Sequence, residues 1–390
     1  MAEARESEAA GLAGQRDVAQ ANALLSETVW AGIDRLLSDY AELRAGDDVA
    51  VLYTPESRDS AALVGVACER RGHDPVFLPM RPLRDASFPE RLARAVPRSR
   101  SRPGKCVVLT FERDTMSHHG AIRSHFADYD PAQVRVVRAI NSGADLFTTG
   151  LSMTPEELSA LNAALIERLA GTRRLRVTTR AGTDLEIRLD NQRFRFISNR
   201  GMAQSPQFII IPAGEVATFP AEISGTLAAD FALNVNMIYD GDVRLSDRPV
   251  VVEIEDGAAT GLQCDDPHMR RFLEEGFARA NARRVGELGF GTNKAVVEAV
   301  PENSHLNERV PGVHLGFGQH NQTNESAGYE CDIHIDLCAK GGRLWFDDDP
   351  VPLDLEGLAP SGCPHPEMAR DEDVFSEELQ GEDCCGLVRS

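Results

Sequence analysis

The sequence predicts an α/β protein with an N-terminal doubly wound α/β domain and a C-terminal mixed α+β domain. Short apolar runs alternate with helical patterns between residues 20 and 173, which is typical of a parallel-sheet domain. Between residues 174 and 350 the pattern changes to strands in which apolar and polar residues alternate. We expect a flexible N-terminus at residues 1–19 and a disordered acidic tail at residues 351–390.

The elements of the first domain follow from these patterns in order. Apolar residues recur at helical spacing in Asn22–Arg44 and in Ser60–Arg71. Short apolar runs predict buried strands at Val49–Tyr53, Pro75–Pro79, Lys105–Phe111 and Val134–Ile140. Thr154 opens a capping box, with proline at the first helical position, and begins a helix to about Ala170. No glycine-rich phosphate-binding motif is present, so the domain does not imply a nucleotide.

The sequence predicts an antiparallel meander at the start of the second domain. Its strands are expected at Leu175–Thr179, Asp184–Leu189 and Arg193–Ile197. Further strands are expected at Gly225–Asn236 and Val250–Glu255, followed by a helix that Asp266 caps and that ends near Arg284.

Charge and composition exclude several classes of function. The chain holds 61 acidic against 41 basic residues, a net charge of −20, which argues against nucleic acid or an anionic membrane as partner. No apolar run is long enough to span a bilayer, and the first residues lack the apolar segment of a secretory signal. The eight cysteines show no CxxC pair. We therefore expect a cytoplasmic protein with reduced thiols.

Three strands late in the second domain place polar side chains beside glycines. Side chains alternate between the two faces of a strand, so in each of these strands one face is apolar and the other carries glycines and polar residues. The residues on the second face are Glu287, Gly289 and Gly291 in the first strand, His314, Gly316, Gly318 and His320 in the second, and Asp332, His334 and Asp336 in the third. A face of glycines beside a carboxylate or an imidazole leaves space for an ion and a substrate.

The types of side chain in these strands indicate which metals would bind. His334 and Asp336 lie about 6.5–7 Å apart along one strand face, a separation that can bracket a cation. Oxygen and nitrogen ligands without a thiolate at the same spacing favour Zn²⁺, Mn²⁺, Co²⁺ or Fe²⁺ over a structural cysteine–zinc site. The second domain is therefore predicted to bind a metal.

Motifs across residues 175–346 resemble the aminopeptidase T/S family of metallopeptidases. The segment Pro212–Pro220 resembles that family's P-x-G-E-V-x-T-x-P motif, and Gly286–Asn293 resembles its G-E-x-x-x-G-x-N. Asn307–Gly318 resembles its D/E…H-x-A-x-G segment, and His334–Asp336 its H-x-D. The order and spacing of the motifs together, rather than any single motif, carry the resemblance.

The resemblance implies a pair of divalent metals, Zn, Co, Mn or Mg, that activate water and polarise an amide carbonyl. It also implies a homodimer and a peptide or small-molecule substrate. Glu287 would bridge the metals and handle the proton of the attacking water. The implied ligands, carried over position by position, are Glu215, Glu287, His314, His334 and Asp336.

One position departs from the family pattern. The family has a tyrosine seven residues after its third metal ligand, and this chain has Asn321 there. Asparagine can donate a hydrogen bond to an oxyanion but cannot serve as a proton donor. We expect Asn321 or His320 to contact the developing oxyanion, with Tyr329 as another possible substitute.

The same residues more distantly resemble the ring-cleaving 2,5-dihydroxypyridine dioxygenases, which use one Fe(II). That family shares the H-x-D of His334 and Asp336, but it has histidine where this chain has Glu287 and an apolar residue where it has Glu215. Glu287, His334 and Asp336, with or without His314, could still form a mononuclear site of the facial-triad type.

We therefore expect an enzyme, a metal-dependent hydrolase of the aminopeptidase T/S type that cleaves a peptide or amide bond in a specialised-metabolite pathway. The first alternative is a mononuclear non-haem Fe(II) ring-cleaving dioxygenase on the same fold. The second is a catalytically inactive binding homologue, which the missing tyrosine alone supports.

Overall fold

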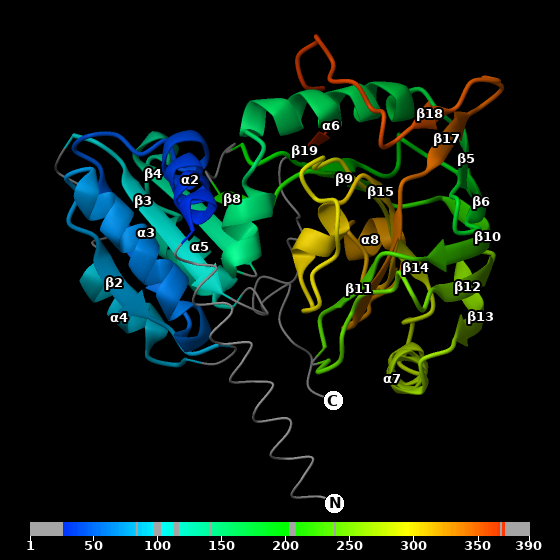
Figure 1. The fold of residues 1–390 in the computed structure, drawn as a ribbon, viewed down its shortest axis with the longest axis horizontal. Helices are drawn as coiled ribbons and strands as arrows, with labels where there is room; N and C mark the ends of the chain where they lie inside the picture. The colour runs from blue at the N-terminus through cyan, green and yellow to red at the C-terminus, as the bar shows by residue number, and fades with distance from the viewer. Residues whose placement is uncertain are drawn as a thin grey trace, which may run out of the picture.

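The computed structural model describes residues 26–82, 85–96, 103–112, 117–140, 142–202, 208–237, 239–366 and 369–370. The N-terminus at 1–19 and residues 371–390 of the predicted tail lie outside these residues. Residues 351–366 of that tail are described, and the disorder expected for them is wrong: Leu353–Asp354 forms a strand, and Leu355 and Leu358 are buried in the core of the second lobe. The described residues form two lobes, one around a parallel sheet and one around two mainly antiparallel sheets (Figure 1). In these ranges no helix has the length and apolar character needed to cross a membrane.

The first lobe is a five-stranded parallel sheet with strand order β2-β1-β3-β4-β8. Its strands are β1 (Asp48–Tyr53), β2 (Val76–Pro79), β3 (Cys106–Glu112), β4 (Val134–Ile140) and β8 (Phe208–Ile211). One face packs against α2 (Glu27–Arg35), its continuation η1 (Leu36–Tyr40), α3 (Arg58–Arg70) and η4 (Leu146–Gly150). The other packs against α4 (Phe88–Ala95) and α5 (His119–Phe126), and short turns lie at η2 (Pro55–Ser57) and η3 (Pro131–Gln133). The predicted α/β class is confirmed.

Two elements cross the boundary drawn at residue 173. Strand β8 joins the first sheet beside β4, although it lies well inside the range assigned to the second domain. Helix α6 (Pro155–Ala170) buries Leu165 and Leu169 in the core of the second lobe, although it precedes the boundary. The first sheet is therefore not built from residues 20–173 alone. A four-residue apolar run such as β8 does not show in the sequence which sheet it completes.

The second lobe contains two seven-stranded sheets. The first has β13 (Ala258–Cys264), β12 (Val250–Glu255), β10 (Glu222–Ala229), β6 (Asp184–Arg188), β5 (Arg174–Thr178), β17 (Arg343–Phe346) and β18 (Leu353–Asp354). The second has β11 (Ala232–Val235), β16 (His334–Lys340), β15 (Gly312–Gly318), β14 (Val285–Gly291), β9 (Glu215–Thr218), β7 (Phe196–Asn199) and β19 (Ala369–Arg370). The remaining helices are α7 (Pro267–Phe277), η5 (His305–Arg309) and α8 (Asn324–Ala327).

The structure corrects three expectations for this lobe. Strands β5 and β6 form the expected hairpin, but β7 leaves it and pairs with β9 in the other sheet. The strand expected over Gly225–Asn236 is two strands, β10 and β11, one in each sheet. Helix α7 ends at Phe277 because the chain beyond it turns, with Asn281 at a positive φ of 62°. Alternation predicts a strand's faces but not its neighbours.

Apolar side chains from both sheets of the second lobe form one core, which α6 completes. The faces predicted to be apolar lie in it, with Leu288, Phe290, Leu315, Phe317 and Ile335 all buried. The opposite face of β14, β15 and β16 is therefore the face that presents the polar residues.

A buried ion pair links two strands of the first lobe. The Arg138 guanidinium on β4 lies 2.6 Å from the Glu112 carboxylate on β3, and neither side chain is more than 1 % exposed. Arg138 also donates to Thr110 Oγ1 and to the Ser117 carbonyl, and Ser117 donates its N–H to Glu112. The network satisfies both charges inside the lobe.

Replacing Arg138 with methionine should lower the free energy of unfolding by about 3–5 kcal/mol, because Glu112 would be left as an uncompensated buried charge. Chemical denaturation measures the loss. The control is Arg94→Met, which removes an exposed pair with Glu90 and should cost less than about 1 kcal/mol. Equal effects of the two substitutions would show that the buried pair is not structural.

Candidate metal centre

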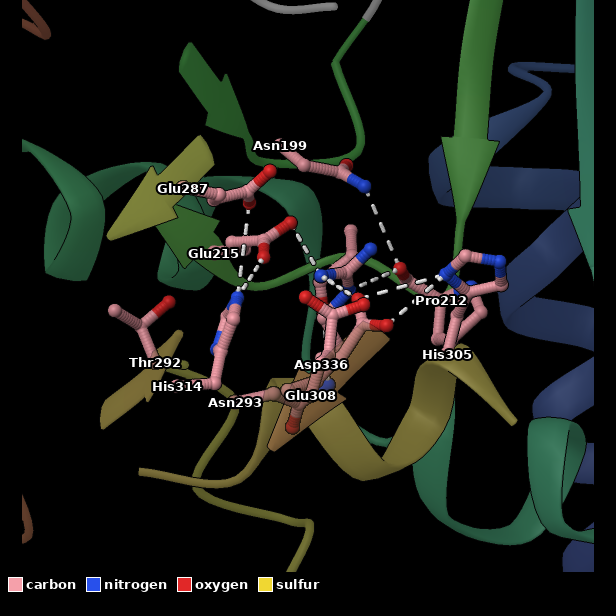
Figure 2. A network of polar contacts seen from close by, with 12 residues as sticks. Asn199, Pro212, Glu215, Glu287, Thr292, Asn293, His305, Glu308, His314 and Asp336 are labelled. Atoms are coloured by element: carbon pink, nitrogen blue, oxygen red, sulfur yellow. Dashed lines mark hydrogen bonds and ion pairs between the residues drawn. The ribbon is translucent and has the colours of Figure 1, made fainter. Parts of the chain in front are cut away.

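The five predicted ligands lie on four neighbouring strands of one sheet. Glu215 begins β9, Glu287 is on β14, His314 is on β15, and His334 and Asp336 are on β16. The strand order β16-β15-β14-β9 brings them together on the polar face, and Figure 2 shows four of them converging. Four of them are buried, and His334 is partly exposed, with 13 % of its side chain accessible.

Glycines on the neighbouring strands make room for these side chains. In the β14–β15 register Gly289 lies opposite His314, and Gly316 lies opposite Glu287. Gly316 also lies opposite Asp336 on β16. A Cβ atom on Gly289 would overlap the His314 imidazole. The glycines predicted to leave a gap therefore provide the space that the ligands themselves occupy.

The donor atoms form two groups that share Glu287. In the first group, His314 Nε2 lies 2.9 Å from Glu215 Oε1 and 3.7 Å from Glu287 Oε1. In the second, His334 Nε2 lies 3.0 Å from Asp336 Oδ1 and 3.8 Å from Glu287 Oε2. Ligands about 2.1 Å from one ion lie about 3.0–3.5 Å from each other. Among the described residues, the donor atoms of Glu215, Glu287 and His314 all lie within 4.8 Å of one another, so the first group has the dimensions of a metal site. In the second group the short distances are those from His334 to its two neighbours.

The alignment of these atoms also fits metal ligands. Within the described residues, His314 Nε2 and Asp336 Oδ1 are buried atoms with no hydrogen-bond partner, despite their short contacts. In each pair a histidine nitrogen and a carboxylate oxygen lie close together, but they are not aligned for a hydrogen bond. Two ligands of the same metal ion have this arrangement. On this test the residues present fit a divalent metal.

His334 is oriented from its other nitrogen. Its Nδ1 contacts the Gln319 carbonyl oxygen at 2.9 Å. A carbonyl oxygen only accepts, so this contact places a proton on Nδ1 and leaves Nε2 toward Glu287 and Asp336. Such a carbonyl partner fixes the tautomer that a metal ligand needs.

Glu215 is positioned by its backbone. Gly214 precedes it with a φ of 111°, where a Cβ atom would lie 2.7 Å from Asn293 Cβ, so this position requires glycine. The Asn162 amide on α6 donates to the Glu215 carbonyl at 2.8 Å and accepts from the Thr292 hydroxyl at 2.5 Å. The side chain of Glu215 is therefore aimed from a rigid strand end.

A cation that the sequence did not indicate lies beside Glu215. Arg309, the last residue of η5, is 1 % exposed and its Nη1 forms an ion pair with Glu215 Oε2. The same nitrogen lies 3.2 Å from Glu308 Oε2, and Arg309 Nε donates to the Pro212 carbonyl at 3.0 Å. Figure 2 shows this network joining the ligand groups to η5.

Glu308 is also a member of this network. It accepts a hydrogen bond from Asn234 on β11 and lies 3.4 Å from His305 Nδ1. In the sequence Glu308 lies in the Asn307–Gly318 segment, and the motif there does not predict its place in this network. The sequence offered no signal for the other members, because an arginine in a short 3-10 helix is normally exposed.

Burial and neighbouring charges shift the pKa values of the ligands in the metal-free protein. Burial alone would lower the pKa of His334, but Asp336 and Glu287 raise it to about 10. Burial likewise opposes the shift at His314, where Glu215 and Glu287 raise the pKa well above its ordinary value. Burial raises the pKa of Asp336 to about 6, against the effect of His334. Protons therefore occupy the imidazoles near neutral pH until a metal displaces them.

Glu215 and Glu308 shift in the opposite direction. Burial would raise the pKa of Glu215, but the Arg309 guanidinium and then His314 outweigh it and lower the pKa. At Glu308, burial is outweighed by His305 and Arg309, and the pKa is lowered well below its usual range. Both carboxylates stay ionised without a metal because a cation is already beside them.

The residues expected to contact an oxyanion differ in whether their hydrogen-bonding groups are already engaged by other parts of the chain. The ring nitrogens of His320 contact the carbonyl oxygens of Gln322 and Tyr329, at 3.0 and 2.8 Å. The Tyr329 hydroxyl donates to the Gly318 carbonyl at 2.9 Å. The Asn321 side chain accepts from Gln322, while its buried Nδ2 has no hydrogen-bond partner among the described residues. Asn321 therefore keeps a donor, and His320 and Tyr329 are engaged by the backbone.

Replacing Gly316 with alanine should lower metal affinity at least about tenfold. This is the size of the loss caused by mutating a residue that orients a metal ligand. The new Cβ atom would lie 2.6 Å from His334 Cε1 and 2.9 Å from Asp336 Oδ1 and Glu287 Cβ. Metal titration measures the change. Gly171→Ala is the control, because no heavy atom lies within 4 Å of its Cβ position. Unchanged affinity in Gly316→Ala would place the metal elsewhere.

One family of known proteins matches most of the chain. The family model described as NicX, 2,5-dihydroxypyridine 5,6-dioxygenase, matches residues 38–354. A comparison with curated proteins finds no match. The family match thus coincides with the resemblance that the motifs ranked second.

Five solved chains match the structure. The 2,5-dihydroxypyridine dioxygenase from Pseudomonas putida KT2440 has a TM-score of 0.59 at 17 % identity, over 86 % of this chain and 97 % of its own. AmpT from Thermus thermophilus has a TM-score of 0.52 at 15 % identity, over 84 % of this chain and 97 % of its own. At these identities the likeness shows the fold. Both resemblances that the motifs carried are confirmed.

Proposed function

The chain belongs to the 2,5-dihydroxypyridine 5,6-dioxygenase family, and on this premise we propose that it is a non-haem Fe(II) enzyme that cleaves a hydroxylated heteroaromatic ring. The observation that carries the proposal is the position of His334 Nε2, which lies 3.0 Å from Asp336 Oδ1 and 3.8 Å from Glu287 Oε2. One imidazole and two carboxylates on one face of a sheet suit a divalent metal with open positions.

The metal, when bound, would supply the binding and activation of dioxygen and of a phenolic oxygen that protein side chains lack. Both oxygen atoms of O₂ enter the product of such a cleavage, so no external reductant is needed. The hydrophobic core behind the sheet and the buried ligands limit access of water. His334 is the most exposed ligand, so we place the substrate on its side of the centre.

Asn321 is the residue of this chain that we assign to the substrate. Its buried Nδ2 has no hydrogen-bond partner among the described residues, which leaves a donor for a hydroxyl or ring-carbonyl oxygen of the substrate. His320 is not assigned this role, because its nitrogens already contact backbone carbonyls.

The geometry of Glu287 favours one second candidate, a two-metal hydrolase. Its Oε1 faces His314 and its Oε2 faces His334, at 3.7 and 3.8 Å, as a carboxylate shared between two metals would. The fold shared with AmpT is compatible with this candidate.

Parallel assays of one preparation distinguish the two functions. The protein is loaded anaerobically with Fe(II) and mixed with 2,5-dihydroxypyridine and other hydroxypyridines in an oxygen electrode. Equal portions loaded with Zn²⁺, Co²⁺ or Mn²⁺ are mixed with aminoacyl amides. Oxygen uptake that depends on both Fe(II) and a hydroxypyridine supports the dioxygenase. Amine release without oxygen uptake would overturn it in favour of the hydrolase.

A further inference from the structure

The last described part of the chain lies against the second lobe as a strap, residues 355–366 and 369–370, which we name the C-terminal strap. At its start Leu355 is buried in the core of the lobe. Further along, the Ser361 hydroxyl donates to Glu167 on helix α6 at 2.8 Å. The strap ends as β19, which pairs in parallel with β7 at the edge of the sheet that carries the predicted ligands.

One side chain of the C-terminal strap reaches the interior of the lobe. His365 Nε2 lies 2.8 Å from the hydroxyl oxygen of Ser198 on β7, and Ser198 is fully buried. The same oxygen accepts a hydrogen bond of 3.0 Å from the Asn162 amide on α6. Because a hydroxyl has one proton and two lone pairs, Ser198 can accept from Asn162 and donate to His365 at the same time. His365 is therefore connected to Asn162 through one buried hydroxyl group.

The contacts continue from Asn162 to the strands that carry the predicted ligands. Asn162 is fully buried, its amide donates to the Glu215 backbone carbonyl at 2.8 Å, and its oxygen accepts from the Thr292 hydroxyl at 2.5 Å. An amide nitrogen has two protons, one for Ser198 and one for the Glu215 carbonyl. Thr292 directly follows β14, the strand of Glu287. Asn162 thus joins the ends of two strands whose carboxylate ligand atoms lie within 4.8 Å of each other.

We propose that the C-terminal strap is part of the metal centre, because His365, through Ser198 and Asn162, holds Glu215 in its place at the centre. This inference rests on the proposed metal-dependent function. The three residues are positioning residues, since they act on the backbone of a predicted ligand and not on the metal. Partners of this kind orient a ligand, and a buried network that loses one member no longer fixes the others.

The test compares His365→Ala with Ser361→Ala. The first removes the contact with Ser198, and the second removes a strap contact that leads only to α6. Titration with Zn²⁺, and with Fe(II) under anaerobic conditions, should show a metal affinity about three- to tenfold lower in His365→Ala, less than the loss of about 10–100-fold that follows mutation of a direct partner of a ligand. Ser361→Ala should bind metal as the wild type does. His365→Gln, which keeps a polar atom near the position of Nε2, should restore the affinity.

Hydrogen exchange of the metal-free protein gives a second readout that does not depend on bound metal. In His365→Ala the amides of β9, the strand that Glu215 begins, should exchange severalfold faster than in the wild type. Ser198→Ala should have the same effect. The double variant should exchange no faster than either single variant, because both substitutions interrupt the same chain of contacts.

Three results would overturn the inference: exchange of β9 in His365→Ala at the wild-type rate, metal affinity in His365→Ala at the wild-type value, or additive effects of His365→Ala and Ser198→Ala. Equal losses in His365→Ala and Ser361→Ala would also overturn it, since the strap would then only stabilise the lobe. A wild type that binds no metal would instead contradict the proposed function, and the exchange measurement would still decide whether the strap holds Glu215.

Discussion

Glu287→Gln is expected to lose bound metal and turnover together. Glu287 has an oxygen toward each histidine, so whichever group binds the metal needs its charge. An amide of the same shape lacks that charge and donates where the carboxylate accepts. Mutation of a residue that only orients a metal ligand typically lowers metal affinity about 10–100-fold. Loss of a ligand itself should cost more, so we expect metal affinity to fall by more than about a hundredfold. Metal titration and initial rates under both assays measure the change.

The matched control for this variant is Glu222→Gln. Glu222 follows the motif that contains Glu215, yet it lies on β10 in the other sheet, where it is 65 % exposed and paired with Arg188. Metal content and rate should be unchanged in this control. Retention of metal and of most activity by Glu287→Gln would show that the centre is not built as described.

Metal binding is expected to tighten with rising pH and to release a proton. In the metal-free protein the pKa of His334 is raised to about 10, so at neutral pH its imidazole holds a proton that a metal must displace. Calorimetric titration in two buffers of different ionisation enthalpy measures the protons released. Affinity that is independent of pH between 6 and 9 would exclude His334 as a ligand.

The same shift predicts how stability depends on pH. A histidine whose pKa is raised on folding stabilises the protein fully below its ordinary pKa, and this contribution is lost as pH rises toward the folded value. The raised pKa of Asp336, about 6, has the same sign, but its contribution is lost between the ordinary pKa of 3.8 and about pH 6, below the range in which His334 acts. The metal-free protein should therefore become less stable between about pH 6.5 and 10.

The metal-bound protein should not follow this decline, because the cation replaces the proton. Thermal melts at pH 6.5 and 9, with and without metal, test both statements. A metal-free protein that gains stability over this range, or an identical decline with and without metal, would contradict the assignment of the ligands.

The sequence predicted those parts of the fold that local pattern determines. The strand over Val134–Ile140, the capping box at Thr154 and the hairpin of β5 and β6 appear as expected. Pairing between distant segments was not predictable. The chain returns to the parallel sheet with β8 and sends β7 to the second sheet, choices that depend on the whole core.

The candidate site shows the same division. Alternation along single strands, with the motif resemblance, identified Glu287, His314, His334 and Asp336, and the structure brings them together with Glu215. Arg309, Asn162 and Asn234 were missed because they reach the site from other elements, and nothing in their local sequence marks them as buried. The dimer and the cytoplasmic location expected from the sequence stay predictions.

The most direct test of this account is the metal content of the wild-type chain, purified without chelator and reconstituted anaerobically. We predict one divalent ion per chain, lost on substitution of His334 or Asp336. Two ions per chain, both dependent on Glu287 and one dependent on Glu215, would contradict the account and identify a two-metal centre.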